Sequence, residues 1–175
     1  MISYRSAYAN EAETIARLHA ASWQKHYRGI LRDTYLDQDV AADRLQLWQG
    51  RFQNPKGNQH ILVAVDGEEV CGFACTYAED DARYGALLDN LHVLPHWQGQ
   101  GIGYRLMQLT AQWVHQRNCN SGLYLWVYEE NTAARSFYER IGGTVAETTT
   151  VENPGGGVAS VLRIIWPDPS AVLPT

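Results

Sequence analysis

The fold is decided by a short glycine-rich stretch, Gln98-Gly99-Gln100-Gly101-Ile102-Gly103. It follows an apolar run that ends before Pro95, and it precedes a segment whose apolar residues have helical spacing. Glycines let backbone amides converge, and the first amides of a helix lack internal partners at an end that the helix dipole makes electropositive. The stretch therefore predicts a loop and helix start that binds a phosphate-bearing ligand.

Two other phosphate-binding motifs do not fit this spacing. The dinucleotide fingerprint needs a glycine where Tyr104 stands, and the phosphate loop of nucleoside triphosphatases needs Gly-Lys-Ser/Thr, which this stretch lacks. The remaining alternative is a turn that only shortens the connection between a strand and a helix. The glycines alone leave that alternative open.

The rest of the chain alternates between strand and helix patterns. Strand patterns cover residues 2–8, 60–65, 70–75, 87–93, 123–128, 144–151 and 158–166. Helical patterns begin at the capping-box pair Asn10 and Glu13 and recur around 41–52, 102–113 and 133–141. Glu79-Asp80-Asp81 predicts an exposed loop. This order predicts a single mixed α/β domain over residues 1–167, with helices on both faces of the sheet, and a flexible tail over 168–175.

Composition narrows the class of protein. A chain of 175 residues with 45% apolar and 19% charged residues is typical of one globular domain. Its net charge of −5 disfavours nucleic acid as a partner, and it has neither a secretory signal nor a membrane span, so we expect a cytoplasmic protein.

The cysteines are odd in number and form no Cys-x-x-Cys pair, so Cys71, Cys75 and Cys119 are predicted to be reduced, mostly buried thiols rather than disulfide or zinc ligands. The alternative is a covalent acyl-enzyme at one of them, although no partner His or Asp is visible in the sequence.

Two further segments carry a resemblance to a known family. Leu91-His92-Val93-Leu94-Pro95 with Gln98-x-x-Gly101-x-Gly103 resembles the acyl-CoA signature of the GCN5-related N-acetyltransferase (GNAT) superfamily. The segment from Asn131 to Gly142 is similar to that superfamily's Asn-x-x-Ala-x-x-Phe-Tyr-x-x-x-Gly pattern. The resemblance extends to the element order from residue 2 to 166. It implies a mixed, mostly antiparallel seven-stranded sheet whose fourth and fifth strands splay apart.

The resemblance also implies an acetyl-CoA site between these two strands, with no metal. The fourth strand is implied to bind the pantetheine arm, and the glycine-rich stretch is implied to bind the pyrophosphate. The Val93 amide is implied to face the thioester carbonyl, where it can stabilise an oxyanion. The residues assigned to acetyl-CoA are Leu91, His92, Val93, Gln98, Gly99, Gln100, Gly101, Ile102, Gly103, Asn131, Ala134 and Tyr138.

Asn131, Ala134 and Tyr138 fall on one helical face, which is expected to meet the thiol. A phenol keeps its proton at neutral pH because its reference pKa is about 10, so Tyr138 is the predicted general acid for the departing thiolate. The alternative is an aromatic residue that packs the helix against the sheet. Asp89 is the predicted base because it is the carboxylate nearest to the position of the family's frequent glutamate. Water, His92 or no single residue remain alternatives.

The implied reaction is direct transfer of an acetyl group from acetyl-CoA to a primary amine. In the family, the region corresponding to residues 23–52 walls the acceptor pocket, and here it is rich in aromatic residues, of which Trp23 and Tyr27 are the predicted substrate contacts. Such a wall suits a cationic or apolar acceptor. A small-molecule amine is preferred to a protein or peptide N-terminus. A non-catalytic acyl-CoA sensor, a longer acyl chain, transfer to oxygen and a homodimer remain open.

Overall fold

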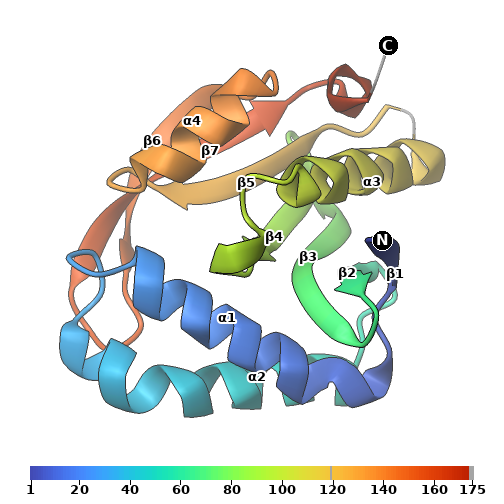
Figure 1. Ribbon diagram of the computed structural model, residues 1–175. Helices are drawn as coiled ribbons and strands as arrows, with labels where there is room; N and C mark the ends of the chain where they lie inside the picture. The colour runs from blue at the N-terminus through green and yellow to red at the C-terminus, as the bar shows by residue number, and fades with distance from the viewer. Residues whose placement is uncertain (119, 174–175) are drawn as a thin grey trace.

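The computed structural model describes residues 1–118 and 120–173, which form one seven-stranded sheet (Figure 1). The strands are β1 Ser3–Ser6, β2 Gln59–Asp66, β3 Glu69–Asp81, β4 Gly85–Val93, β5 Leu123–Tyr128, β6 Thr144–Glu152 and β7 Val158–Trp166. Their order is β1-β2-β3-β4-β5-β7-β6, and every neighbouring pair is antiparallel except β4 and β5. The predicted mixed, mostly antiparallel sheet is confirmed.

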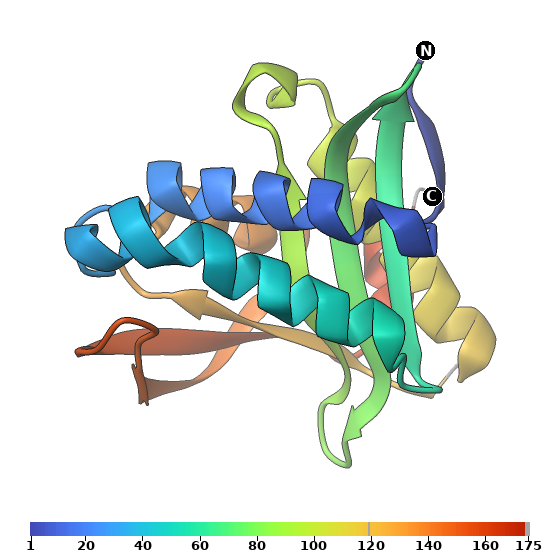
Figure 2. The ribbon, with the colours of Figure 1, turned by 90° about the horizontal axis from the view of Figure 1, so that it is seen from below.

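Helices cover both faces of this sheet, as predicted (Figures 1 and 2). They are α1 Ala12–His26, α2 Val40–Gln53, α3 Ile102–Arg117 and α4 Thr132–Arg140. The helices α1 and α2 pack against one face, and α3 and α4 against the other. The apolar run of β2 shows why its sequence does not alternate. Ile61 and Val63 join the core under α1 while Leu62 and Ala64 join the core under α3, so the strand is buried on both sides.

The two middle strands separate soon after they meet. The parallel pairing of β4 with β5 consists of Ala86 with Leu123 and Leu87 with Tyr124. Along its other edge β4 stays paired with β3, although the register shifts between Cys75 and Thr76, which leaves Asp89 in a bulge. A bulge bends its strand and increases the local twist. β4 therefore diverges from β5 toward its C-terminal end, and the predicted splay is confirmed.

The start of the first helix differs from the prediction. A 3-10 turn, Ala9–Glu11, precedes α1, and the Tyr8 amide donates to the Glu11 carboxylate at 2.7 Å. The Arg5 guanidinium also holds this carboxylate, with N–O distances of 2.8 and 2.9 Å. The capping pair predicted at Asn10 and Glu13 is therefore wrong, because the ion pair with β1 fixes the helix start on Glu11.

The acidic run Glu79-Asp80-Asp81 is likewise not a loop, since β3 continues through Asp81. Its carboxylates have partners across the sheet. The Tyr124 hydroxyl donates to Asp80 at 2.5 Å, and the Arg163 guanidinium lies 3.4 Å from the Asp81 carboxylate. These tertiary contacts explain why an acidic segment extends the strand.

The C-terminal segment is packed as far as the structure describes it, whereas the sequence predicts a loose tail from residue 168. Pro169–Val172 form a 3-10 turn, and Val172 is buried in the core that α3 covers. Cys71 and Cys75 are buried free thiols, as expected. The predictions for Cys119 and for the last two residues lie outside the described residues. No helix in the described ranges is long and apolar enough to cross a membrane.

Candidate functional site

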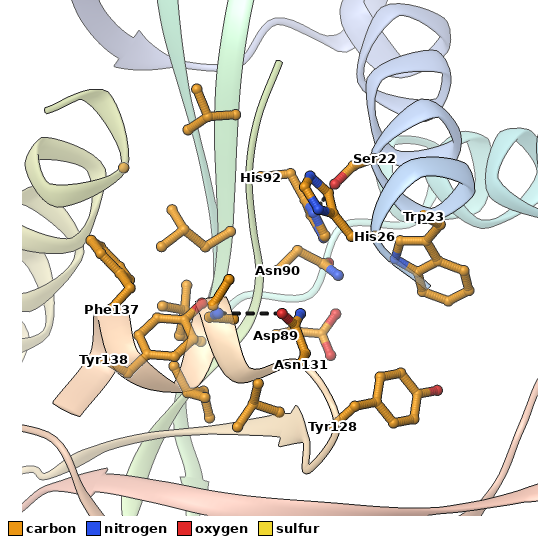
Figure 3. A pocket seen from close by; sticks show the side chains of 18 of the residues that line it. Ser22, Trp23, His26, Asp89, Asn90, His92, Tyr128, Asn131, Phe137 and Tyr138 are labelled. Atoms are coloured by element: carbon orange, nitrogen blue, oxygen red, sulfur yellow. Dashed lines mark hydrogen bonds between the residues drawn. The ribbon is translucent and has the colours of Figure 1, made fainter. Parts of the chain in front are cut away.

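A cavity of about 900 Å³ opens where β4 and β5 separate (Figure 3). The start of α3 and the helix α4 form one side of it, and α1 with α2 forms the other. Every residue that the sequence assigned to the site lines this cavity, with the exception of Gln100, whose side chain donates instead to the His96 carbonyl at 3.3 Å. Segments that are far apart in the chain thus meet around one space.

The glycine-rich loop forms the outer end of the cavity. Gly99 and Gly101 have φ angles of +77° and +79°, and Gly101 is the residue that precedes the first turn of α3. A Cβ atom at either glycine would meet no other atom within 4 Å, so glycine is needed for the left-handed backbone and not for close packing. The first turn of the 16-residue helix α3 holds no acidic residue. These features fit a phosphate group bound by backbone amides.

The edge of β4 that faces the cavity carries main-chain groups suited to an extended ligand. The Leu94 amide donates to the Cys71 carbonyl on β3 at 2.8 Å. Successive amides of a strand point in opposite directions, so the amides of Val93 and Leu91 point away from β3, into the space that β5 leaves. The Gln98 side chain donates to the Val93 carbonyl at 3.0 Å, which ties the glycine loop to the end of this strand.

Helix α4 presents Asn131 and Tyr138 to the cavity. The Asn131 side chain accepts the Ala134 amide at 3.2 Å and so caps the helix (Figure 3). Tyr138 is 8% exposed, and burial raises the pKa of its phenol. The phenol is therefore protonated throughout the neutral range. Figure 3 shows Tyr138 and Phe137 across the cavity from His26 and Trp23.

The opposite wall contains an ion pair. The Arg51 guanidinium on α2 lies 2.5 Å from the Asp89 carboxylate and donates to the Asn90 side chain at 2.6 Å. Asp89 is the only carboxylate among the described residues that line the cavity. The bulge in β4 thus places one acid in the wall that α1 and α2 form, and α2 supplies its counter-charge.

A pair of histidines lies behind this wall. The His92 Nδ1 atom is 2.8 Å from the Ser22 hydroxyl, and the ring lies 4.7 Å from the buried ring of His19. Burial, together with the nearby charges of His26 and Arg44, lowers the pKa of His92 to about 3. At neutral pH His92 is therefore a neutral imidazole with little affinity for a proton, although it is half-exposed to the cavity.

Several cavity residues were not found from the sequence. They are Ser22, His26, Arg44, Arg51 and Tyr128. Arg44 and Arg51 are seven residues apart, which is two helical turns, so they project from one face of α2. The seven-residue spacing of the two arginines is the signal in the sequence. The arginines lie beside the apolar stripe of Leu45, Trp48 and Phe52, however, where charged residues are usually exposed to solvent.

Comparisons with known proteins agree with this architecture. An uncharacterized N-acetyltransferase of Archaeoglobus fulgidus is 34% identical over 140 residues, which cover 77% of this chain and 87% of the relative. One of Bacillus subtilis is 27% identical over 175 residues, covering 98% and 96%. The crystal structure of an N-acetyltransferase from Thermoplasma acidophilum in complex with coenzyme A superposes with a TM-score of 0.72 at 20% identity, covering 93% of this chain and 98% of that one. A family model described as the acetyltransferase (GNAT) family matches residues 15–143, and the chain belongs to that family.

Proposed function

We propose that this protein is an N-acetyltransferase that moves an acetyl group from acetyl-CoA to the primary amine of a small molecule. The observation that carries the proposal is the single cavity that joins the glycine-rich loop, the diverging edge of β4 and a polar wall formed by α1 and α2. A phosphate cradle at one end and a carboxylate at the other allow a thioester and an amine to meet between them.

The reaction requires two proton transfers. The neutral amine nitrogen attacks the thioester carbonyl carbon, and the Val93 amide donates a hydrogen bond to the oxygen on which negative charge develops. The C–S bond then breaks, and the thiolate takes the proton of the Tyr138 hydroxyl. Burial raises the pKa of that phenol, so the hydroxyl keeps its proton at neutral pH until the sulfur carries charge, and burial likewise raises the affinity of the thiolate for a proton.

Asp89 is proposed to take the proton that the amine must lose, directly or through water. It is the only carboxylate among the described residues lining the cavity, and the Arg51 guanidinium 2.5 Å away holds it in place. His92 is poorly suited to this role because burial lowers its pKa to about 3. A carboxylate here also attracts an ammonium ion before it is deprotonated.

A small acceptor is favoured by the closure of the acceptor end. The Tyr128 hydroxyl donates to the Asn153 side chain at 3.0 Å, and that side chain donates to the Ile30 carbonyl at 3.2 Å. These bonds hold the loop after β6 against the loop after α1. Relatives of this chain include an aminoglycoside N(6')-acetyltransferase and a ribosomal-protein alanine N-acetyltransferase. Because one name indicates a small-molecule acceptor and the other a protein acceptor, the preference for a small molecule rests on the geometry of these loops.

Calorimetric titration with acetyl-CoA tests the donor site. We expect saturable binding that Gly101→Trp abolishes, because the indole fills the space where the phosphates lie. Gly67→Trp is the matched control, since Gly67 also has a positive φ and open surroundings but lies in the turn between β2 and β3. NADH and ATP serve as ligand controls. Absence of binding by folded wild-type protein, or equal loss in both variants, contradicts the proposal.

A further inference from the structure

The acceptor wall contains a guanidinium whose acid partner is not among the described residues that line the cavity. Arg44 on α2 lines the cavity with a side chain that is 11% exposed, and it lies 4.2 Å above the ring of Trp23. Its ion pair is with the adjacent Asp43 at 3.2 Å, and this carboxylate also accepts the hydroxyl of Tyr35. The buried Nε atom of Arg44 has no hydrogen-bond partner among the described residues. Burying a donor without a partner costs free energy, so a further acceptor that reaches this guanidinium would be stabilising.

Arg51 lies two turns further along α2 in the same wall, and its guanidinium has hydrogen-bond partners that also line the cavity. It is bound to both Asp89 and Asn90, at 2.5 and 2.6 Å, and its guanidinium carbon lies 4.8 Å above the Trp48 ring. Arg51 and Asp89 lie on the cavity lining as a pair of opposite charges. Arg44 also lines the cavity, whereas its partner Asp43 is not among the described lining residues, so on this wall two guanidiniums face the cavity with one carboxylate.

The same contact changes the expectation for the aromatic wall. The sequence suggests that Trp23 could receive a cationic substrate, but in the structure the guanidinium of Arg44 already lies over that ring. A polycation in this compartment would meet Arg44 instead of an open aromatic face. The Arg44 guanidinium on the cavity lining instead attracts an anionic group.

We propose that the acceptor is an amine that also carries a carboxylate, as a free amino acid does, and that Arg44 binds the carboxylate. This inference rests on the proposed function. A planar guanidinium can form two parallel hydrogen bonds with a carboxylate. Stacking on Trp23 holds the Arg44 guanidinium in place before the substrate arrives. The ammonium group of such a zwitterion is attracted to Asp89, which shares the cavity with Trp23 and lies across from Tyr138 (Figure 3).

The test is a matched acceptor series at fixed acetyl-CoA, followed by release of the thiol. The probes are alanine, methionine and phenylalanine, their primary amides, the amines that lack the carboxylate, and putrescine. For the best side chain we expect kcat/KM of the free acid to exceed that of its amide and of its decarboxylated amine by about ten- to a hundredfold, as for a charge-assisted hydrogen bond.

The variants Arg44→Gln and Arg44→Lys connect this preference to the residue. Arg44→Gln is expected to raise KM for the acids by a similar factor and to leave KM for the amides and the affinity for acetyl-CoA unchanged. Arg44→Lys should retain part of the preference for acids, because lysine keeps the positive charge but cannot form the two parallel hydrogen bonds of a guanidinium. Arg17→Gln, an exposed position on α1, is the matched control for loss of one positive charge.

The outcomes distinguish the inference that the acceptor carries a carboxylate from the proposal that the protein is an acetyltransferase. Equal or better turnover of amides, decarboxylated amines or putrescine overturns the carboxylate inference and leaves the acetyltransferase proposal standing. The carboxylate inference is overturned in the same way if Arg44→Gln lowers kcat/KM equally for acids and amides. Failure of every amine despite intact binding of acetyl-CoA overturns the proposed function itself. Should Arg44→Gln not fold, the wild-type series and Arg44→Lys still decide.

Discussion

Tyr138 combines a packing role with the proposed chemistry. Its ring lies 6.0 Å from that of Trp166, edge to face, while its side chain also reaches the cavity. Tyr138→Phe keeps the ring contact and removes only the hydroxyl. We predict that kcat falls by about 10²- to 10⁴-fold, as for loss of a general acid, while the dissociation constant of acetyl-CoA changes less than about twofold. Steady-state kinetics and calorimetry measure the two quantities. An unchanged kcat would mean that the ring only packs.

The buried histidine His19 makes stability depend on pH. It is fully buried, its Nδ1 atom accepts the Trp48 indole at 3.0 Å, and burial lowers its pKa well below the ordinary value. Below the histidine pKa of about 6.5 in the unfolded chain, the unfolded state therefore binds a proton at His19 that the folded state does not bind. Stability is intact above this value and falls as pH decreases below it, by up to about 1.4 kcal/mol per pH unit for each such group.

We predict that His19→Gln reduces this acid sensitivity, because glutamine has no ionising group and its side-chain oxygen can accept the indole N–H. Urea unfolding at pH 7 and pH 5 measures it, as the difference between the two unfolding free energies. A variant that loses as much stability as wild type between these pH values would assign the effect to other groups, such as His92 and His60, whose pKa values burial also lowers.

At the scale of elements, the loop between β6 and β7 lies close against Tyr35, beside the proposed acceptor end. A Cβ at Gly155 would lie 2.4 Å from Tyr35, in the segment between α1 and α2, whereas a Cβ at Gly157 meets nothing within 4 Å. Both glycines have positive φ, so alanine strains the backbone similarly at both positions. The two substitutions differ in whether they push the loops apart.

We therefore predict that Gly155→Ala raises KM for the acceptor by about tenfold and that Gly157→Ala does so by much less, since about 1.4 kcal/mol corresponds to a factor of ten. The affinity for acetyl-CoA should be the same in both variants. Kinetics with the best acceptor, together with calorimetry, measures this. Equal effects of the two substitutions would show that backbone strain, and not the contact with Tyr35, controls the acceptor end.

Across the whole molecule, the cavity that contains the proposed donor site is lined from both faces of the sheet. A ligand that binds the folded protein alone stabilises it by about 2.7 kcal/mol at 100 times its dissociation constant. For a chain of 175 residues this predicts a rise in Tm of roughly 5 to 10 °C with acetyl-CoA. Differential scanning fluorimetry with wild type and Gly101→Trp tests it. An equal rise in the variant would locate the binding elsewhere.

Predictability differed with the range of the interactions involved. The strand and helix patterns and the glycine-rich loop were predicted closely, because they depend on periodicity and on backbone conformation within a few residues. The extension of β3 through Asp81 and the start of α1 were not, because each depends on an ion pair or hydrogen bond with a distant residue, Arg163 in one case and Arg5 in the other. Local patterns carry no record of such partners.

The sequence by itself determined the fold class, the family resemblance and the segments that line the donor side, since backbone groups next to glycines and at a helix start are specified locally. Only the tertiary structure decided the acceptor side. It placed Arg44 over Trp23, paired Arg51 with Asp89, and joined the loops at Asn153. The physical reason is that charge balance in a cavity depends on which side chains from separate elements meet there, and that is settled by packing.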